Sequence, residues 1–185
     1  MESRALKAGR QRGFSLFELM VYLLVVSILF ATMLNRYRDI PGEAERANFM
    51  AVVAQLKAGV NLQMIHAIAS VRWHSLQELE GSNPMDLMLE TPTNYLGELS
   101  GVNPATIDGR TWYFDLDSGE LVYTARNAEN LYLIQDGNAS PARQIRFRIQ
   151  NVYGGESGLE WQGIILATVT PYNWHSVPLD QEINP

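Results

Sequence analysis

The sequence predicts an α+β protein in which a long N-terminal helix, half transmembrane and half amphipathic, packs on a small antiparallel β-sheet. Three observations support this fold. Residues 14–34 form an apolar run long enough to cross a bilayer, apolar residues then recur at helical spacing as far as Val71, and strand-like segments follow residue 110. The expected regions are a leader (1–13), a transmembrane helix (14–34), an amphipathic helix (35–71), a variable loop (72–110) and an antiparallel sheet with a C-terminal tail (111–185).

Charge is distributed unevenly along the chain. Four basic side chains and one acidic side chain precede Phe14, which leaves a formal charge of −9 on the remainder because the whole chain of 185 residues carries −6. An acidic body repels phosphate backbones, so we expect no nucleic-acid partner. The basic residues before the apolar run predict a single-pass inner-membrane protein with a cytoplasmic N-terminus and a periplasmic C-terminal domain.

The start of the apolar run, "GFSLFEL" from Gly13 to Leu19, carries the most specific pattern in the chain. It resembles the class III leader of type IV pilins and type II secretion pseudopilins. In that family a peptidase cleaves after a Gly, the next residue is N-methylated, and a Glu stands at mature position five. The resemblance implies cleavage between Gly13 and Phe14, methylation of Phe14, and a role in subunit assembly for Glu18.

A carboxylate within an apolar run of this length is costly in lipid and indicates a function. Glu18 lies four residues after Phe14, about one helical turn away. The resemblance implies that Glu18 pairs with the Phe14 amine of a neighbouring subunit, which would compensate its charge only in the assembled state. Two simpler interpretations, a secretory signal peptide and a plain signal anchor, explain the basic start but give Glu18 no role.

After Pro41-Gly42, where we expect a kink or a short unwound piece, apolar residues recur at steps of three and four. This spacing predicts an amphipathic helix with one buried stripe. The expected stripe consists of Phe49, Val52, Val53, Leu56, Val60, Met64, Ile68 and Val71.

The segment 72–110 is rich in Gly, Pro, Asn and Ser, which favours loops, with one possible helical turn within 84–89. Beyond it, 111–116 and 120–124 flank a turn at Gly119 and predict a β-hairpin. Strict alternation over 145–150 predicts a half-buried strand, and a further strand is expected near 163–169.

We find no pattern typical of an enzyme: no H-E-x-x-H, Walker A or G-x-S-x-G motif is present, and a chain without Cys cannot use a thiol nucleophile. No cofactor is expected. Asp115 and Asp117 are weak calcium candidates, since a hairpin turn alone rarely supplies six to eight oxygen ligands. The four Trp residues suggest, equally weakly, a sugar-binding surface.

The resemblance therefore implies a non-enzymatic minor pilin-like subunit that enters or primes a pilus. Its implied partners are other pilin-like subunits, the prepilin peptidase and methylase, the inner-membrane assembly platform and membrane lipid. The Cys-free acidic body with "WYFDLDSGELVY" is similar to minor pilins of the mannose-sensitive haemagglutinin pilus system. A minor pseudopilin of a type II secretion system, and a membrane-anchored periplasmic binding domain that never assembles, remain the alternatives.

Overall fold

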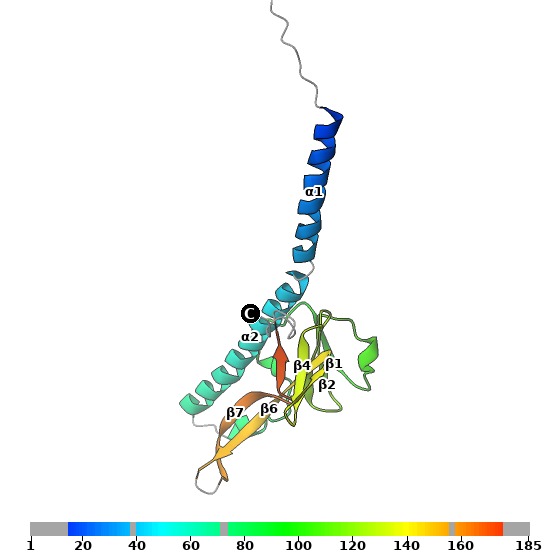
Figure 1. Cartoon of the computed structure of the whole chain (residues 1–185). Coiled ribbons are helices and arrows are strands. Elements are labelled where there is room, and N and C mark those ends of the chain that lie inside the picture. Colours follow the sequence, from blue (N-terminus) through cyan, green and yellow to red (C-terminus); the bar gives the residue numbers. More distant parts are fainter. Residues whose placement is uncertain (1–14, 38–39, 71–73, 156–157, 176–185) are drawn as a thin grey trace, which may run out of the picture. The chain divides into compact units, whose positions relative to one another are not determined.

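The computed structural model describes residues 15–37, 40–70, 74–155 and 158–175, and the chain divides into two compact units, Met1–Ile40 and Pro41–Pro185 (Figure 1). The predicted Val71, the leader and the C-terminal tail lie outside the described residues. The first unit contains helix α1 (Leu16–Tyr37). The second contains a helix, two sheets and short helical turns, which makes the protein α+β as the sequence predicts.

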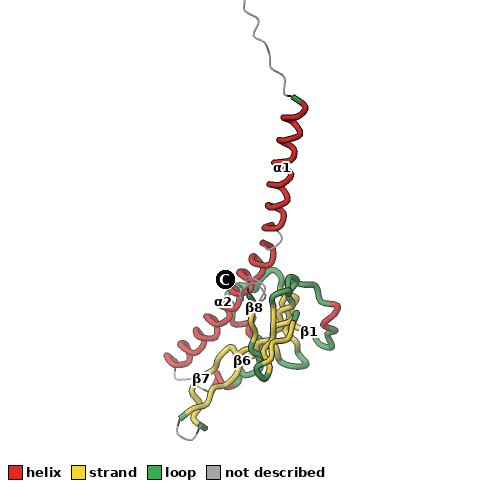
Figure 2. Tube along the Cα trace, in the orientation of Figure 1, coloured by secondary structure: helices red, strands yellow, loops and turns green. Residues whose placement is uncertain are grey.

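Helix α2 (Ile40–Ser70) lies along one side of the strands of the second unit (Figure 2). The expected interruption at Pro41-Gly42 is not an unwound piece, because both residues lie in the first turn of α2. Proline is tolerated at this position, since the first amide groups of a helix have no intrahelical acceptor.

The larger sheet has five strands in the order β1-β2-β3-β6-β7. Its strands are β1 (Tyr95–Leu99), β2 (Thr111–Asp115), β3 (Glu120–Thr124), β6 (Gln144–Gly154) and β7 (Glu160–Thr168). The predicted hairpin is confirmed as β2–β3, which closes through Gly119 at a φ of 64°. The predicted antiparallel sheet is confirmed for β2, β3, β6 and β7, and β1, which the sequence did not predict, adds a parallel pair with β2.

The expected loop between helix and sheet contains regular structure besides β1. Its helical turns are α3 (His74–Gln77), η1 (Pro84–Leu87) and η2 (Pro104–Thr106). The buried Asn83 fixes part of this segment: its side-chain amide donates to the Tyr95 hydroxyl at 2.8 Å and to Glu98 at 3.0 Å. These side-chain contacts, which have no simple sequence pattern, order a stretch whose composition favours loops.

A second sheet of three strands, in the order β5-β4-β8, is absent from the sequence prediction. Its strands are β4 (Leu131–Gln135), β5 (Asn138–Pro141) and β8 (Tyr172–Trp174). Two of them are only three or four residues long, too short for alternation to be recognised.

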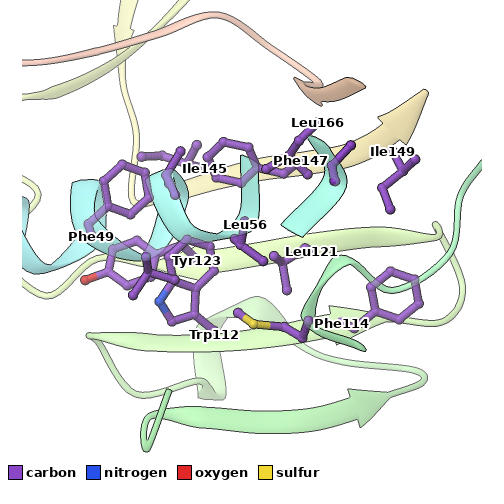
Figure 3. Packing of buried hydrophobic residues seen from close by; sticks show 14 of the residues in the cluster. Phe49, Leu56, Trp112, Phe114, Leu121, Tyr123, Ile145, Phe147, Ile149 and Leu166 are labelled. Atoms are coloured by element: carbon purple, nitrogen blue, oxygen red, sulfur yellow. The ribbon is translucent and has the colours of Figure 1, made fainter. Parts of the chain in front are cut away.

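The core lies between α2 and the larger sheet (Figure 3), and Phe49 of α2 packs among its aromatic rings. The Phe49 ring stacks on Trp112 at a centroid distance of 5.5 Å and an interplanar angle of 6°, and it approaches Tyr123 to 4.9 Å. The predicted alternation of β6 is confirmed, since Ile145, Phe147 and Ile149 are all buried. Aromatic pairs at such distances add to the stabilisation that burial provides.

The predicted stripe on α2 is confirmed from Phe49 to Val60 and is wrong near its end. Ile68 is 51% exposed, whereas Ala67 is buried. Each step of four residues rotates the side chain by about 40° around a helix of 3.6 residues per turn, so Ile68 has left the face that Val60 occupies. Ala67, seven residues after Val60, stays on that face.

Candidate functional site

Helix α1 presents a mainly apolar surface from Leu16 to Leu34. The segment Leu16–Leu34 is long and apolar enough to cross a membrane, and none of it is buried. Phe17, for example, is 76% exposed. Side chains of this kind are stable in contact with lipid or with other apolar helices, and not in contact with water.

The first turn of α1 is fixed by a capping interaction. The backbone N–H of Glu18 donates to the Ser15 hydroxyl at 3.2 Å. Ser15 and Glu18 have the spacing of a capping box, and an acidic residue in the first turn also interacts favourably with the helix dipole. This geometry places the Glu18 carboxylate, which is exposed, at the end of the helix that follows Gly13 and Phe14. Those two predicted site residues lie outside the described residues.

Two hydroxyl side chains of α1 are satisfied within the helix. The Ser27 hydroxyl donates to the Leu23 carbonyl at 2.7 Å, and the Thr32 hydroxyl donates to the Leu29 carbonyl at 2.9 Å. These bonds remove the cost of placing a hydroxyl group in an apolar environment. Glu18 is the charged side chain within Leu16–Leu34, and a charge in an apolar environment is stable only with a counterion.

Residues 9–34 match the family described as the prokaryotic N-terminal methylation motif. The match covers 26 of the 185 residues and includes Gly13, Phe14 and Glu18. The comparisons with curated proteins and with solved structures found no match. The matched motif together with the apolar helix supports a type IV pilin-like or pseudopilin-like protein with a membrane anchor.

The two calcium candidates are engaged in the hairpin turn. Asp115 accepts hydrogen bonds from the Asp117 N–H and the Ser118 hydroxyl, at 3.1 and 2.9 Å. Asp117 accepts from the Ser100 hydroxyl at 2.7 Å and the Gly101 N–H at 2.6 Å, and these two bonds lower the pKa of its carboxyl group. Within the described ranges, no group of three or more His, Cys, Asp or Glu side chains is placed to hold a metal. Both carboxylates stabilise the turn, and Asp117 joins it to the loop after β1.

The three described tryptophans do not form a common surface. Trp112 and Trp174 are buried in the core, and Trp161 donates to the Asn151 side chain at 2.8 Å. Trp73 lies outside the described residues. Trp112 and Trp174 therefore cannot stack on a sugar, because such stacking requires an exposed ring face.

Among the described ionisable groups of the second unit, Glu45 on α2 is the most densely hydrogen-bonded, and the sequence analysis missed it. Its carboxylate accepts hydrogen bonds from the Arg126 N–H at 2.7 Å, from the Asn127 N–H at 3.0 Å and from the Tyr123 hydroxyl at 3.0 Å. Arg110 approaches the same carboxylate to 3.3 Å. Burial, the largest single influence, raises the pKa of Glu45, but these hydrogen bonds outweigh it and leave the pKa below its ordinary value.

Arg110 links this network to the start of α2. Its guanidinium donates to the Pro41 carbonyl at 3.1 Å, and its backbone adopts a φ of 68°. A left-handed conformation is uncommon outside Gly and Asn, so the surrounding contacts hold it in place. The network fixes the first turns of α2 on the domain. The spacing offered one indication of Glu45, which stands four residues before Phe49 and thus on the same stripe.

Proposed function

We propose that this chain is a minor type IV pilin-like structural subunit, which a prepilin peptidase cleaves after Gly13 and which then enters or primes a pilus. The observation that carries the proposal is the register of the matched motif with α1. Gly13 and Phe14 precede the first described turn of an apolar, membrane-length helix, and Glu18 lies in that turn. The subunit has no enzymatic role in this proposal.

Cleavage creates the counterion that Glu18 lacks. The new N-terminal amine of Phe14 stays cationic after a single methylation, and it belongs to a different subunit from the carboxylate that it pairs with. Separate ions are costly in an apolar environment, whereas a paired amine and carboxylate compensate one another. The pairing therefore favours the assembled state over the isolated subunit, and a head-to-tail contact of this kind extends into a filament.

The basic leader keeps the N-terminus in the cytoplasm, where the peptidase cleaves, and the second unit lies in the periplasm. The assembly platform in the inner membrane then brings the processed subunit to its neighbours. The finer assignment, to the mannose-sensitive haemagglutinin pilus system, rests on the resemblance of residues 112–123 and the absence of Cys. Loss of exoprotein release on deletion of the gene would favour the pseudopilin alternative instead.

Intact-mass analysis of the membrane-extracted chain tests the proposal. We expect a chain that starts at Phe14 and carries one added methyl group. Gly13→Val should block cleavage, because the peptidase accepts no side chain there, whereas Gly9→Val in the same leader should be processed normally. A chain that still begins at Met1, in cells with an active prepilin peptidase, contradicts the proposal.

A further inference from the structure

An amphipathic pocket of about 420 Å³ opens on the second unit between η2, the start of β6 and the second sheet. Ala105, Leu133 and Ala142 supply apolar lining, and Arg143, Gln144 and Arg146 supply polar lining. A pocket of this size takes a pair of side chains or a small ligand. Its chemistry suits a group that combines an apolar body with a negative charge.

The positive charge of the pocket is only partly compensated. Arg146 is held by Glu120 at 3.0 Å, and Gln144 is oriented by a 3.1 Å bond to the Thr124 hydroxyl. Arg143 donates through its Nε to the Ala125 carbonyl at 3.3 Å and makes no ion pair with any described carboxylate. The guanidinium of Arg143 thus remains available to an external anion, in a chain whose body is otherwise acidic.

A complementary corner lies elsewhere on the same unit, just after η1. Leu89 is 100% exposed and Glu90 is exposed, and no hydrogen bond or ion pair of Glu90 occurs within the described part of the chain. The surrounding stretch 73–109 contains six acidic residues and no Lys or Arg. The corner is fixed on α2, because the backbone carbonyl of the preceding Leu87 packs directly on Gly59. A fully exposed Leu on an ordered corner indicates a contact surface.

We propose that the Leu89–Glu90 corner of one copy of this chain inserts into the Arg143 pocket of a second copy, an inference that rests on the proposed filament function. The Leu89 side chain would contact Leu133 and Ala142, and the Glu90 carboxylate would pair with Arg143. Corner and pocket share no residue, so each copy offers one of each. Such a contact is heterologous and continues from copy to copy instead of closing into a dimer.

Cysteine cross-linking in inner-membrane vesicles tests this contact on the full chain, which contains no Cys of its own. Thr91→Cys beside the corner and Ala105→Cys at the pocket rim, combined in one chain, should give an oxidised ladder of dimers, trimers and longer species. Each single variant should give no ladder. Ala69→Cys combined with Ala105→Cys is the matched control, because Ala69 is exposed at the far end of α2.

Charge exchange then tests the ion pair within the cross-linking background. Glu90→Arg and Arg143→Glu should each lower the ladder yield by about fivefold, because like charges then face one another. The two changes together should restore it. Both positions are exposed, and thermal unfolding verifies that each variant keeps its fold.

The results separate the two proposals. A ladder no stronger than that of the Ala69 control, from a chain whose mass shows removal of residues 1–13, overturns the contact and leaves the proposed function intact. Cross-linking of the pocket to a different protein, or a charge exchange that fails to restore the ladder, also overturns it. A chain that retains its leader contradicts the proposed function itself.

Discussion

The Glu45 carboxylate on α2 accepts a hydrogen bond of 3.0 Å from the Tyr123 hydroxyl on β3, and both side chains are buried. Burial and the neighbouring Glu45 raise the pKa of Tyr123, so its hydroxyl keeps the proton that it donates. The bond joins residues that are 78 positions apart in the chain. It couples the helix to the centre of the sheet through charge as well as through apolar packing.

Glu45→Gln should destabilise the second unit by about 3 kcal/mol, because an amide replaces one of two acceptor oxygens with a donor in a site that is already filled with donors. The fluorescence of the buried Trp112 and Trp174 reports unfolding of the full chain in detergent. The control is Glu43→Gln, because the exposed Glu43 side chain pairs with Arg46 at 3.8 Å. We expect a change below about 0.5 kcal/mol there. Equal effects of the two substitutions would show that Glu45 contributes no more than a surface carboxylate.

The stability that Glu45 provides should depend on pH in a defined direction. The pKa of Glu45 is lowered in the folded state, so its ionised form stabilises the fold fully above the pKa of the unfolded chain, about 4.3 for a free glutamate. This stabilisation is lost as the pH falls through the lower, folded-state pKa. The difference in unfolding free energy between wild type and Glu45→Gln should therefore shrink below about pH 4. A difference that stays constant from pH 6 to the acid limit contradicts this assignment.

The sequence predicted the elements whose pattern is local and long enough to repeat. The hairpin around Gly119 and the alternation of Ile145, Phe147 and Ile149 are of this kind, and both are confirmed. From Gln144 to Ile149, buried residues of β6 alternate with half-buried ones, so the period of two is visible in the residue types.

Other elements depend on partners that are distant in the chain. Strand β1 contains Gly97 at a φ of 91° and pairs with β2 in a parallel register, which its own five residues do not indicate. Glu45 was missed because an acidic residue on a helix is ordinarily solvated, and the groups that bury it come from residues 110–127. For the candidate site, the motif around Gly13, Phe14 and Glu18 could be found from sequence alone. The roles of those three residues stay predictions, because the partner that they imply is another subunit.

Because the buried face of α2 rotates along the helix, the same substitution should have different effects on stability at Leu56 and at Ile68. Leu56 is fully buried, so Leu56→Asp should unfold the second unit by placing a charge in the core, at a cost of several kcal/mol. Ile68→Asp should be tolerated, because this side chain is 51% exposed. Circular dichroism and Trp fluorescence of the full chain distinguish the two outcomes. Loss of structure in the Ile68 variant would mean that Ile68 is buried, as the sequence predicted, and would contradict the exposed position that the structure gives it.

Two glycines of α2 should respond to alanine in opposite directions. A Cβ atom at Gly59 would lie 2.7 Å from the Leu87 carbonyl oxygen, and this contact is with backbone that cannot move aside alone. Gly59→Ala should therefore lower the melting temperature. At Gly42 the nearest atom is at 3.7 Å, an ordinary contact, so Gly42→Ala should gain up to about 1 kcal/mol of helix propensity. A stabilised Gly59→Ala variant would mean that the segment after η1 does not pack on α2 in this way.

Glu18→Ala addresses the assembly role directly. In an isolated subunit the Glu18 carboxylate has no counterion in lipid, whereas in a filament a neighbour's amine compensates its charge. Its removal should spare membrane insertion and cleavage after Gly13, because α1 keeps its apolar length and its Ser15 cap. It should lower incorporation into filaments, because the amine of the adjacent Phe14 then has no partner.

The measurement compares the amount of the chain in membranes with the amount in sheared filaments, for wild type and Glu18→Ala. Ser27→Ala is the matched control within the same helix. Within the described residues its hydroxyl bonds to the Leu23 carbonyl of its own helix, so its loss should leave both amounts unchanged. Equal filament incorporation of wild type and Glu18→Ala would refute the pairing role. A Glu18→Ala subunit that is cleaved, accumulates in the membrane and is depleted from filaments supports it, because cleavage and insertion then proceed without the carboxylate while assembly does not.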